Sequence, residues 1–123
     1  MPIPTDDEVR RALAVLGRRR GLTGPISELG IRNALSLARE LAASGGDETA
    51  ALVFAFSKYP KALTSAWAPF VFLLAVNGLN RCGRELTASH RALAALRIGI
   101  AGGDVSFDQV APWLREHSRS RPR

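Results

Sequence analysis

Apolar residues recur at helical spacing along the chain, separated by Gly, Pro and residues that favour helix caps. Val9, Leu13 and Leu16 stand at i, i+4 and i+7, so they share one face of a helix. Thr5, with Glu8 three residues later, is a capping-box pattern ahead of that stripe. The sequence therefore predicts a first helix that begins here and ends in the run of three arginines that follows.

Two further helices are expected before the middle of the chain. Apolar positions over residues 26–43 indicate a second helical region, which can turn near Gly30. After a Ser-Gly-Gly loop, Asp47 can cap a third helix that runs to about Lys58. Tyr59-Pro60 ends this helix, because the residue before proline disfavours the α region.

The most apolar stretch of the chain, Ala66–Val76, predicts a fourth helix. Pro69 falls close to its first turn, where a missing N–H matters least, and Asn77-Gly78 is expected to cap its end. Because this helix, at about residues 64–77, is apolar nearly all round, we expect it to be the central buried helix. The stretch is about half of the roughly 20 residues that a membrane span needs, so no span is predicted.

The remaining chain predicts two shorter helices. Thr87 opens one that Gly102-Gly103 closes, and Ser106 with Gln109 forms a second capping box at the start of the last. From Arg115 onward the chain is rich in arginine and is expected to fray. No strand pair is expected anywhere in the sequence.

The composition agrees with one globular domain. The chain has 123 residues and a mass of 13.2 kDa, with 46% apolar and 23% charged residues. That length can bury a core but is too short for two ordinary domains. We therefore expect an all-α, single-domain helical bundle of about six helices over residues 1–116, followed by a basic, flexible tail over residues 117–123.

The single cysteine, Cys82, limits the chemistry of the chain. It excludes an intrachain disulfide framework and a multi-cysteine metal site, and it fits a reducing compartment. The neighbouring Arg81 and Arg84 favour a low thiol pKa, and hence reactivity. The chain does not open with a charged and then apolar leader. The sequence therefore predicts a cytoplasmic protein without a metal or another cofactor.

The charge is strongly basic, with 17 Lys and Arg against 11 Asp and Glu, a net charge of +6. The excess gathers in Arg18–Arg20 and in the C-terminal segment. Such patches attract phosphate backbones without sequence preference, so a nucleic-acid-associated module is one interpretation. The aromatic residues, however, lie at core spacing and do not alternate with the basic ones. We favour a solvated basic surface or a site for an acidic partner protein.

Groups that could carry catalysis are few. His90, near a helix start, is either a surface residue on the helix dipole or a weak candidate base, and His117 lies in the tail. The acidic residues around Asp47 and around Asp104 have capping explanations. The residues alone therefore assign no catalytic site and no metal site.

Several segments, in their order and spacing, resemble the Fic/Doc (death-on-curing) family. They are the stretch GPISELGIRNALSLAR from Gly24, the helix Ala50–Lys58, the run Phe70–Val76 followed by Asn77-Gly78-Leu79, and the closing segment Ser106–Leu114. The resemblance covers most of the chain. It implies a helical Fic/Doc-like fold.

The family's signature motif is degenerate in this chain. Active members carry His-x-Phe-x-x-Gly-Asn-x-Arg, in which the His is the base and the turn holds phosphates through backbone N–H groups. Aligned on the His-Pro pair of Doc-like members, Tyr59 replaces the His; aligned without gaps, Phe56 stands at the His and Lys61 at the glycine. Tyrosine, with an ordinary pKa of about 10, is a poor base at neutral pH. These residues argue against AMP or phosphoryl transfer.

The resemblance thus implies a non-catalytic Fic/Doc-like protein that acts by binding another protein. In toxin–antitoxin members of the family the cleft region engages an antitoxin segment, so the partner expected here is an antitoxin-like segment. Lys58, Tyr59, Lys61, Thr64 and Trp67 would then line or flank the mouth of the old active site. Capping and packing of a helix start explain these residues equally well.

An alternative is a divergent transferase that moves AMP or a phosphoryl group onto a protein hydroxyl. Lys58, Lys61 and Thr64 would then bind the anion at a helix N-terminus. Tyr59 or His90 would replace the lost base. Binding of nucleotide and divalent metal separates this alternative from a pure binding module.

Overall fold

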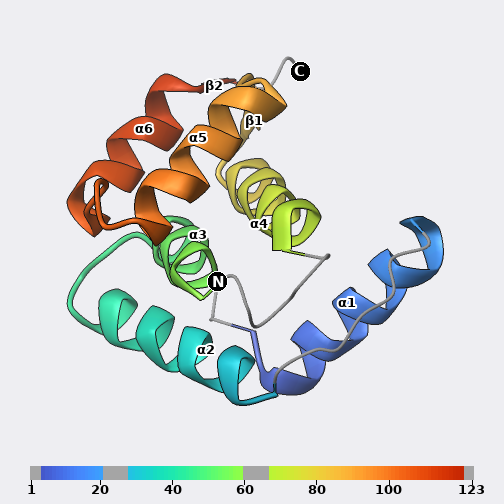
Figure 1. Cartoon of the computed structure of the whole chain (residues 1–123). Coiled ribbons are helices and arrows are strands. Elements are labelled where there is room, and N and C mark those ends of the chain that lie inside the picture. Colours follow the sequence, from blue (N-terminus) through green and yellow to red (C-terminus); the bar gives the residue numbers. More distant parts are fainter. Residues whose placement is uncertain (1–3, 21–27, 60–66, 121–123) are drawn as a thin grey trace.

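The chain was analysed as a computed structural model, which describes residues 4–20, 28–59 and 67–120 (Figure 1). These residues form α-helices joined by short connections, together with one small two-stranded ribbon. The expectation of a mostly helical chain is confirmed. The elements are α1 (Asp6–Arg20), α2 (Glu28–Ala43), α3 (Glu48–Lys58), α4 (Trp67–Arg81), β1 (Arg84–Leu86), α5 (His90–Ala101), the 3-10 turn η3 (Phe107–Gln109), α6 (Val110–Glu116) and β2 (Ser118–Ser120).

Helix α3 is the centre of the bundle. Every residue from Ala50 to Ser57 is buried, and α2, α4, α5, α6 and η3 all pack against it (Figure 1). The sequence predicts instead that the helix near residues 64–77 is central, and that expectation is wrong. The run AALVFAF presents apolar or small side chains in every direction, so neighbours can close on α3 from all sides.

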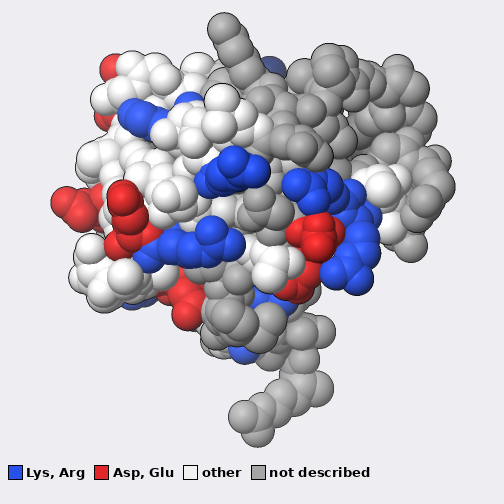
Figure 2. All heavy atoms as spheres, turned by 90° about the horizontal axis from the view of Figure 1, so that it is seen from below, with Lys and Arg blue, Asp and Glu red and all other residues white. Residues whose placement is uncertain are grey.

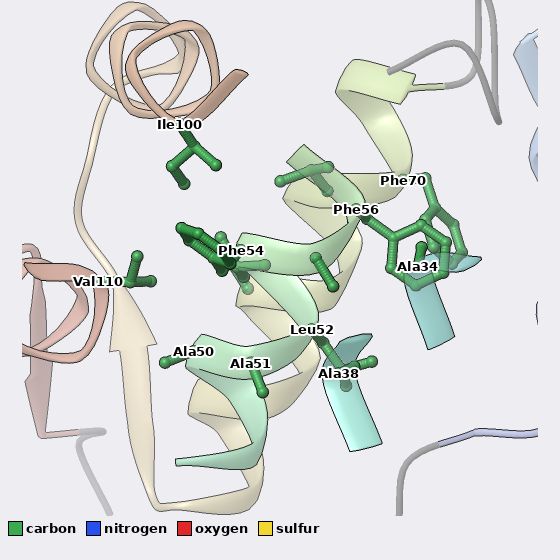
Figure 3. Packing of buried hydrophobic residues seen from close by; sticks show 14 of the residues in the cluster. Ala34, Ala38, Ala50, Ala51, Leu52, Phe54, Phe56, Phe70, Ile100 and Val110 are labelled. Carbon is green, nitrogen blue, oxygen red and sulfur yellow. The ribbon is translucent and has the colours of Figure 1, made fainter. Parts of the chain in front are cut away.

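The side chains of α3 divide between two halves of the core. Phe56 points toward Phe70 of α4 and Ala34 of α2, whereas Phe54 points the other way, toward α5 and α6 (Figure 3). Phe56 and Phe70 meet edge to face with ring centroids 5.1 Å apart, and Phe54 meets Phe107 in the same manner at 5.7 Å. Such pairs are a favourable arrangement of aromatic quadrupoles beyond their buried area.

Helix α4 ends later than expected, and its expected start at residues 64–66 lies outside the described residues. It passes through Asn77 and Gly78, where the sequence predicts a C-cap, and continues to Arg81. Gly78 is buried, and a Cβ at this position would overlap the side chain of Thr49 on α3. The glycine therefore lets two helices approach closely instead of ending one, and the turn that does leave the helix is at Gly83, with φ of +74°.

Most of the expected helix starts are confirmed. Thr5 and Glu8 form the reciprocal capping box of α1, and the Asp47 side chain accepts a 2.9 Å hydrogen bond from Ala50 N at the start of α3. The Ser106–Gln109 capping box is also present. Helix α5, however, begins at His90 with Ser89 as its cap, three residues after the expected Thr87. Helix α2 runs straight through Gly30.

A short antiparallel ribbon joins the end of α4 to the end of α6. Strands β1 and β2 pair Arg84 with Ser120 and Leu86 with Ser118. The expectation of no strand pair is wrong, and β2 lies in the segment that was expected to fray. Thr87 N extends the ribbon by donating to His117 O at 2.7 Å, which explains why α5 does not start there.

Two surface features concern nucleic acid and membranes as partners: the distribution of charge and the hydropathy of the helices. Figure 2 shows acidic side chains beside the basic ones on the face below the view of Figure 1, where α1 and α2 lie. In the described part of the chain, no helix combines the length and apolar character required to cross a membrane.

Candidate functional site

A cleft of about 530 Å³ opens between α1 and α4, with the N-terminal part of α3 as its floor. Its volume is within the range of about 300–1,000 Å³ that is typical of ligand sites. Its apolar lining comes from all three helices: Val9, Ala12, Leu52, Phe70, Leu73 and Leu74. Its polar lining gathers where the helices begin or end: Glu8, Asp47, Glu48, Thr49, Asn77, Arg81 and Cys82.

The apolar part of the cleft follows from the composition of α4. One side of this helix, at Phe70, Val71 and Ala75, is buried in the core. Leu73 and Leu74 on the same helix are only half buried, and they line the cleft together with Val9 and Ala12 of α1. A helix that is apolar all round but packed on one side only presents an apolar surface on its other side.

The polar part of the cleft is held by helix capping. Glu8 Oε1 accepts hydrogen bonds from Thr5 N at 3.1 Å and from Thr5 Oγ1 at 3.2 Å. These bonds, the backbone one first, hold the pKa of the Glu8 carboxyl below its ordinary value of 4.5, and the positive charges of Arg11 and Arg81 add to the lowering. Glu8 is therefore a carboxylate at neutral pH, and its charge lies on the wall of the cleft.

A second hollow of about 230 Å³ adjoins the cleft and leads away from it toward α6. The two hollows share Asp47, Thr49, Gly78 and Cys82. The remaining lining of the second hollow is Leu79, Arg84, Ala111, Leu114 and Arg115. We call the cleft and this hollow together the groove. Cys82, a free and exposed thiol, lies at the junction of its two parts.

The residues singled out in the sequence lie elsewhere or outside the description. Lys58 ends α3, with its Nζ 5.7 Å from the centroid of the Phe54 ring, and the half-buried Tyr59 is the C-cap of that helix. His90 opens α5, where its ring lies 5.0 Å from that of Phe72. None of these three lines the groove.

The other predicted site residues are not placed by the structure. Lys61 and Thr64 lie outside the described residues. Trp67 is the first residue of α4, but its side chain is outside the description. Their assignment to a partner or anion site stays a prediction.

Sequence reasoning assigned the groove residues to other tasks. Leu73 and Leu74 are indistinguishable in the sequence from core positions, and Asp47 and Glu8 are explained by capping. The one available signal was Arg81, Cys82 and Arg84, a thiol between two arginines directly after the most apolar helix. The approach of α1, which makes the cleft, has no local signature.

The arrangement suits binding by shape and charge. Among the described residues, no three His, Cys, Asp or Glu side chains gather closely enough to hold a metal ion. Both imidazoles lie outside the groove, since His117 is stacked on Trp113 with ring centroids 4.0 Å apart. The groove therefore offers apolar contact area, carboxylates and guanidinium groups to a ligand.

The chain was compared with models of known protein families, with curated proteins and with solved structures, and none of them matches it.

Proposed function

We propose that this protein is a binding module that takes an apolar segment of a partner protein into the cleft between α1 and α4. The observation that carries the proposal is the half-covered state of α4. Leu73 and Leu74 are half buried and line an open cleft. An apolar helix laid into such a groove is a common mode of peptide recognition.

The energetics favour such an occupant. Full burial of each leucine-sized side chain contributes about 1.5–3 kcal/mol, part of which offsets the loss of translational and rotational freedom on association. The cleft presents apolar side chains from three helices, and the residues of α3 next to its floor are buried in the core. A preformed site reduces the ordering cost of binding.

The resemblance to the Fic/Doc family supports a module without transferase activity. In the alignment without gaps, the family's His falls on Phe56, whose side chain is fully buried between α3, α2 and α4. In the other alignment it falls on Tyr59, which is the C-cap of α3. Neither position gives an exposed base at a helix N-terminus. We propose a degenerate member of that family, with an antitoxin-like segment as its partner.

The divergent transferase and the nucleic-acid module make different predictions. A transferase would gain thermal stability with ATP and Mg²⁺, because a ligand that binds only the folded state raises Tm. A nucleic-acid module would lose affinity steeply between low and moderate salt. For the binding module we expect neither effect.

The test uses the full chain and a displayed library of random peptides of about 15 residues, long enough for a marginal helix. Enriched peptides are synthesised and titrated while alkylation of Cys82 by iodoacetamide is followed by mass spectrometry. Because Cys82 lines the groove and is the only cysteine, a peptide in the groove should slow its alkylation. Peptides that bind without protecting Cys82 would overturn the proposed site.

A pair of variants separates the cleft from other apolar surface. Leu73→Asp places a charge in the cleft, and we expect it to weaken binding by at least about tenfold, since one apolar anchor is lost. Ile98→Asp is the matched control: Ile98 is 63% exposed on α5 and does not line the groove. Equal effects of the two variants would reject the cleft, and circular dichroism checks that both variants are folded.

A further inference from the structure

The charged side chains that line the groove are mostly acidic at one end and mostly basic at the other. Among the described residues that line the cleft, the carboxyl groups are those of Glu8, Asp47 and Glu48, and the guanidinium is that of Arg81. Among those that line the adjoining hollow, the guanidinium groups are those of Arg84 and Arg115, and the carboxyl group is that of Asp47. A chain of net charge +6 thus has an acidic-lined cleft that leads into a basic-lined end.

The basic end is built from a fixed arginine. Arg84 Nε donates to Ser118 Oγ at 2.8 Å, and Arg84 Nη2 donates to the carbonyls of Ser118 at 3.0 Å and Arg115 at 3.4 Å. These bonds leave the two N–H groups of Nη1 without a partner among the described residues. A guanidinium held in this way is preorganised to bind a carboxylate, at little entropic cost.

Arg115 supplies the second charge. It lies in the last turn of α6, is exposed, and lines the hollow beside the apolar Ala111 and Leu114. Two guanidinium groups at one end of an apolar channel favour a ligand whose apolar part ends in acidic side chains.

We propose that the partner segment is charge-polarised: apolar residues lie on Leu73 and Leu74, a basic residue faces Glu8, and acidic residues reach Arg84 and Arg115. This inference rests on the proposed function, because it specifies the occupant of the same groove. Charge reversal along the groove then fixes one direction of binding, since a reversed segment would bring like charges together.

The peptides enriched on the full chain provide the test. We expect their aligned sequences to carry acidic residues at one end, and an apolar stretch with a basic residue toward the other end. Changing those acidic residues to lysine should weaken binding about two- to tenfold, the range for partly exposed charge pairs. The difference should shrink at 1 M salt, where the Debye length falls to about 3 Å.

A charge swap makes the test specific to the basic end. Arg115→Glu should weaken binding of the acidic peptides and strengthen binding of their lysine forms. Arg91→Glu is the matched control, because Arg91 is an exposed arginine on α5 that lines neither hollow. Arg84 is left unchanged, since it also holds the ribbon.

The outcomes separate this inference from the proposed function. Peptides that protect Cys82 and depend on Leu73, but carry no acidic end and respond equally to the two arginine variants, would overturn the charge pattern and leave the binding module standing. Peptides that fail to protect Cys82, or a library without enrichment, would reject both. A reciprocal response to Arg115→Glu supports the polarised segment.

Discussion

Helices α3 and α4 are both apolar, yet they have different positions in the molecule. In α3, the eight residues from Ala50 to Ser57 are all buried, and packing surrounds the helix. In α4, Phe70, Val71 and Ala75 are buried, whereas Leu73 and Leu74 line an open cleft. Of the two, α4 is the longer and is the one that the sequence marks as central.

The contrast shows that apolar composition does not by itself decide which helix is enclosed. Helix α3 carries several alanines, which let neighbouring helices come close on every side. Helix α4 has Phe70, Val71 and Ala75 in the core, while its Leu73 and Leu74 are only half buried. These two half-buried leucines in the cleft are the basis of the proposed function.

The largest effect is expected from truncating the core side chain that joins the two helices. Phe56→Ala should lower the free energy of unfolding by about 3–5 kcal/mol, because Phe56 is 0% exposed and its loss leaves a cavity against Phe70. Leu73→Ala, in the cleft, should cost only about 1 kcal/mol. Urea unfolding of both variants measures the difference, and similar costs would contradict the view that α4 is half covered.

The close approach of α3 and α4 at Gly78 can be tested next. Gly78→Ala should destabilise the protein by about 1–3 kcal/mol, because the new Cβ overlaps the side chain of Thr49. The double variant with Thr49→Ala should recover part of the loss. Asn77→Ala, at the exposed neighbouring position, serves as the control and should be close to neutral. If Gly78→Ala is also neutral, the two helices do not approach as described.

The N-cap of the central helix is expected to have a smaller effect. Asp47→Ala removes the acceptor for Ala50 N and should cost about 1 kcal/mol. Asp47→Asn keeps an acceptor in the same place and should retain most of the stability. Thermal unfolding followed by circular dichroism compares the three proteins, and equal melting of the Ala and Asn variants would contradict a capping role.

The smallest effect concerns pH and the cap of α1. The folded protein holds the pKa of Glu8 below its ordinary value of 4.5, so the charged cap stabilises the fold above that pH. This contribution is lost as the pH falls through the lowered pKa. The Tm of the native chain minus that of Glu8→Gln should therefore be constant at neutral pH and decrease toward zero in acid. A difference that grows in acid would have the wrong sign.

Local signals predicted much of the secondary structure. The structure confirms the predicted helix caps at Thr5, Asp47 and Ser106 and the predicted helix end at Gly102-Gly103. Each of these features depends on hydrogen bonds within a few residues. The ribbon between β1 and β2 escaped prediction, because each strand has only three residues and the partners are more than thirty positions apart. The sequence also misplaces the end of α4, because a glycine after an apolar helix is typical of a helix end. Only the structure shows that Gly78 lies against the side chain of Thr49.

The candidate site was the least predictable part. Its apolar lining has the same sequence pattern as the core. Its carboxylates Glu8 and Asp47 are explained by helix capping, so the sequence does not indicate a second role for them. Lys58, Tyr59 and His90 were singled out through the resemblance to the Fic/Doc family and as candidate bases, and they do not line the groove. No local pattern indicates that Leu73 and Leu74 line a cleft with α1.

The sequence by itself determined that the chain is helical and where most of its helices begin, because helix periodicity and capping act over a few neighbouring residues. Only the tertiary structure decided which helix is enclosed, which glycine serves a close approach, and where apolar surface remains open. Those outcomes depend on contacts between segments that are far apart in the sequence, and such contacts form only when all the helices pack together.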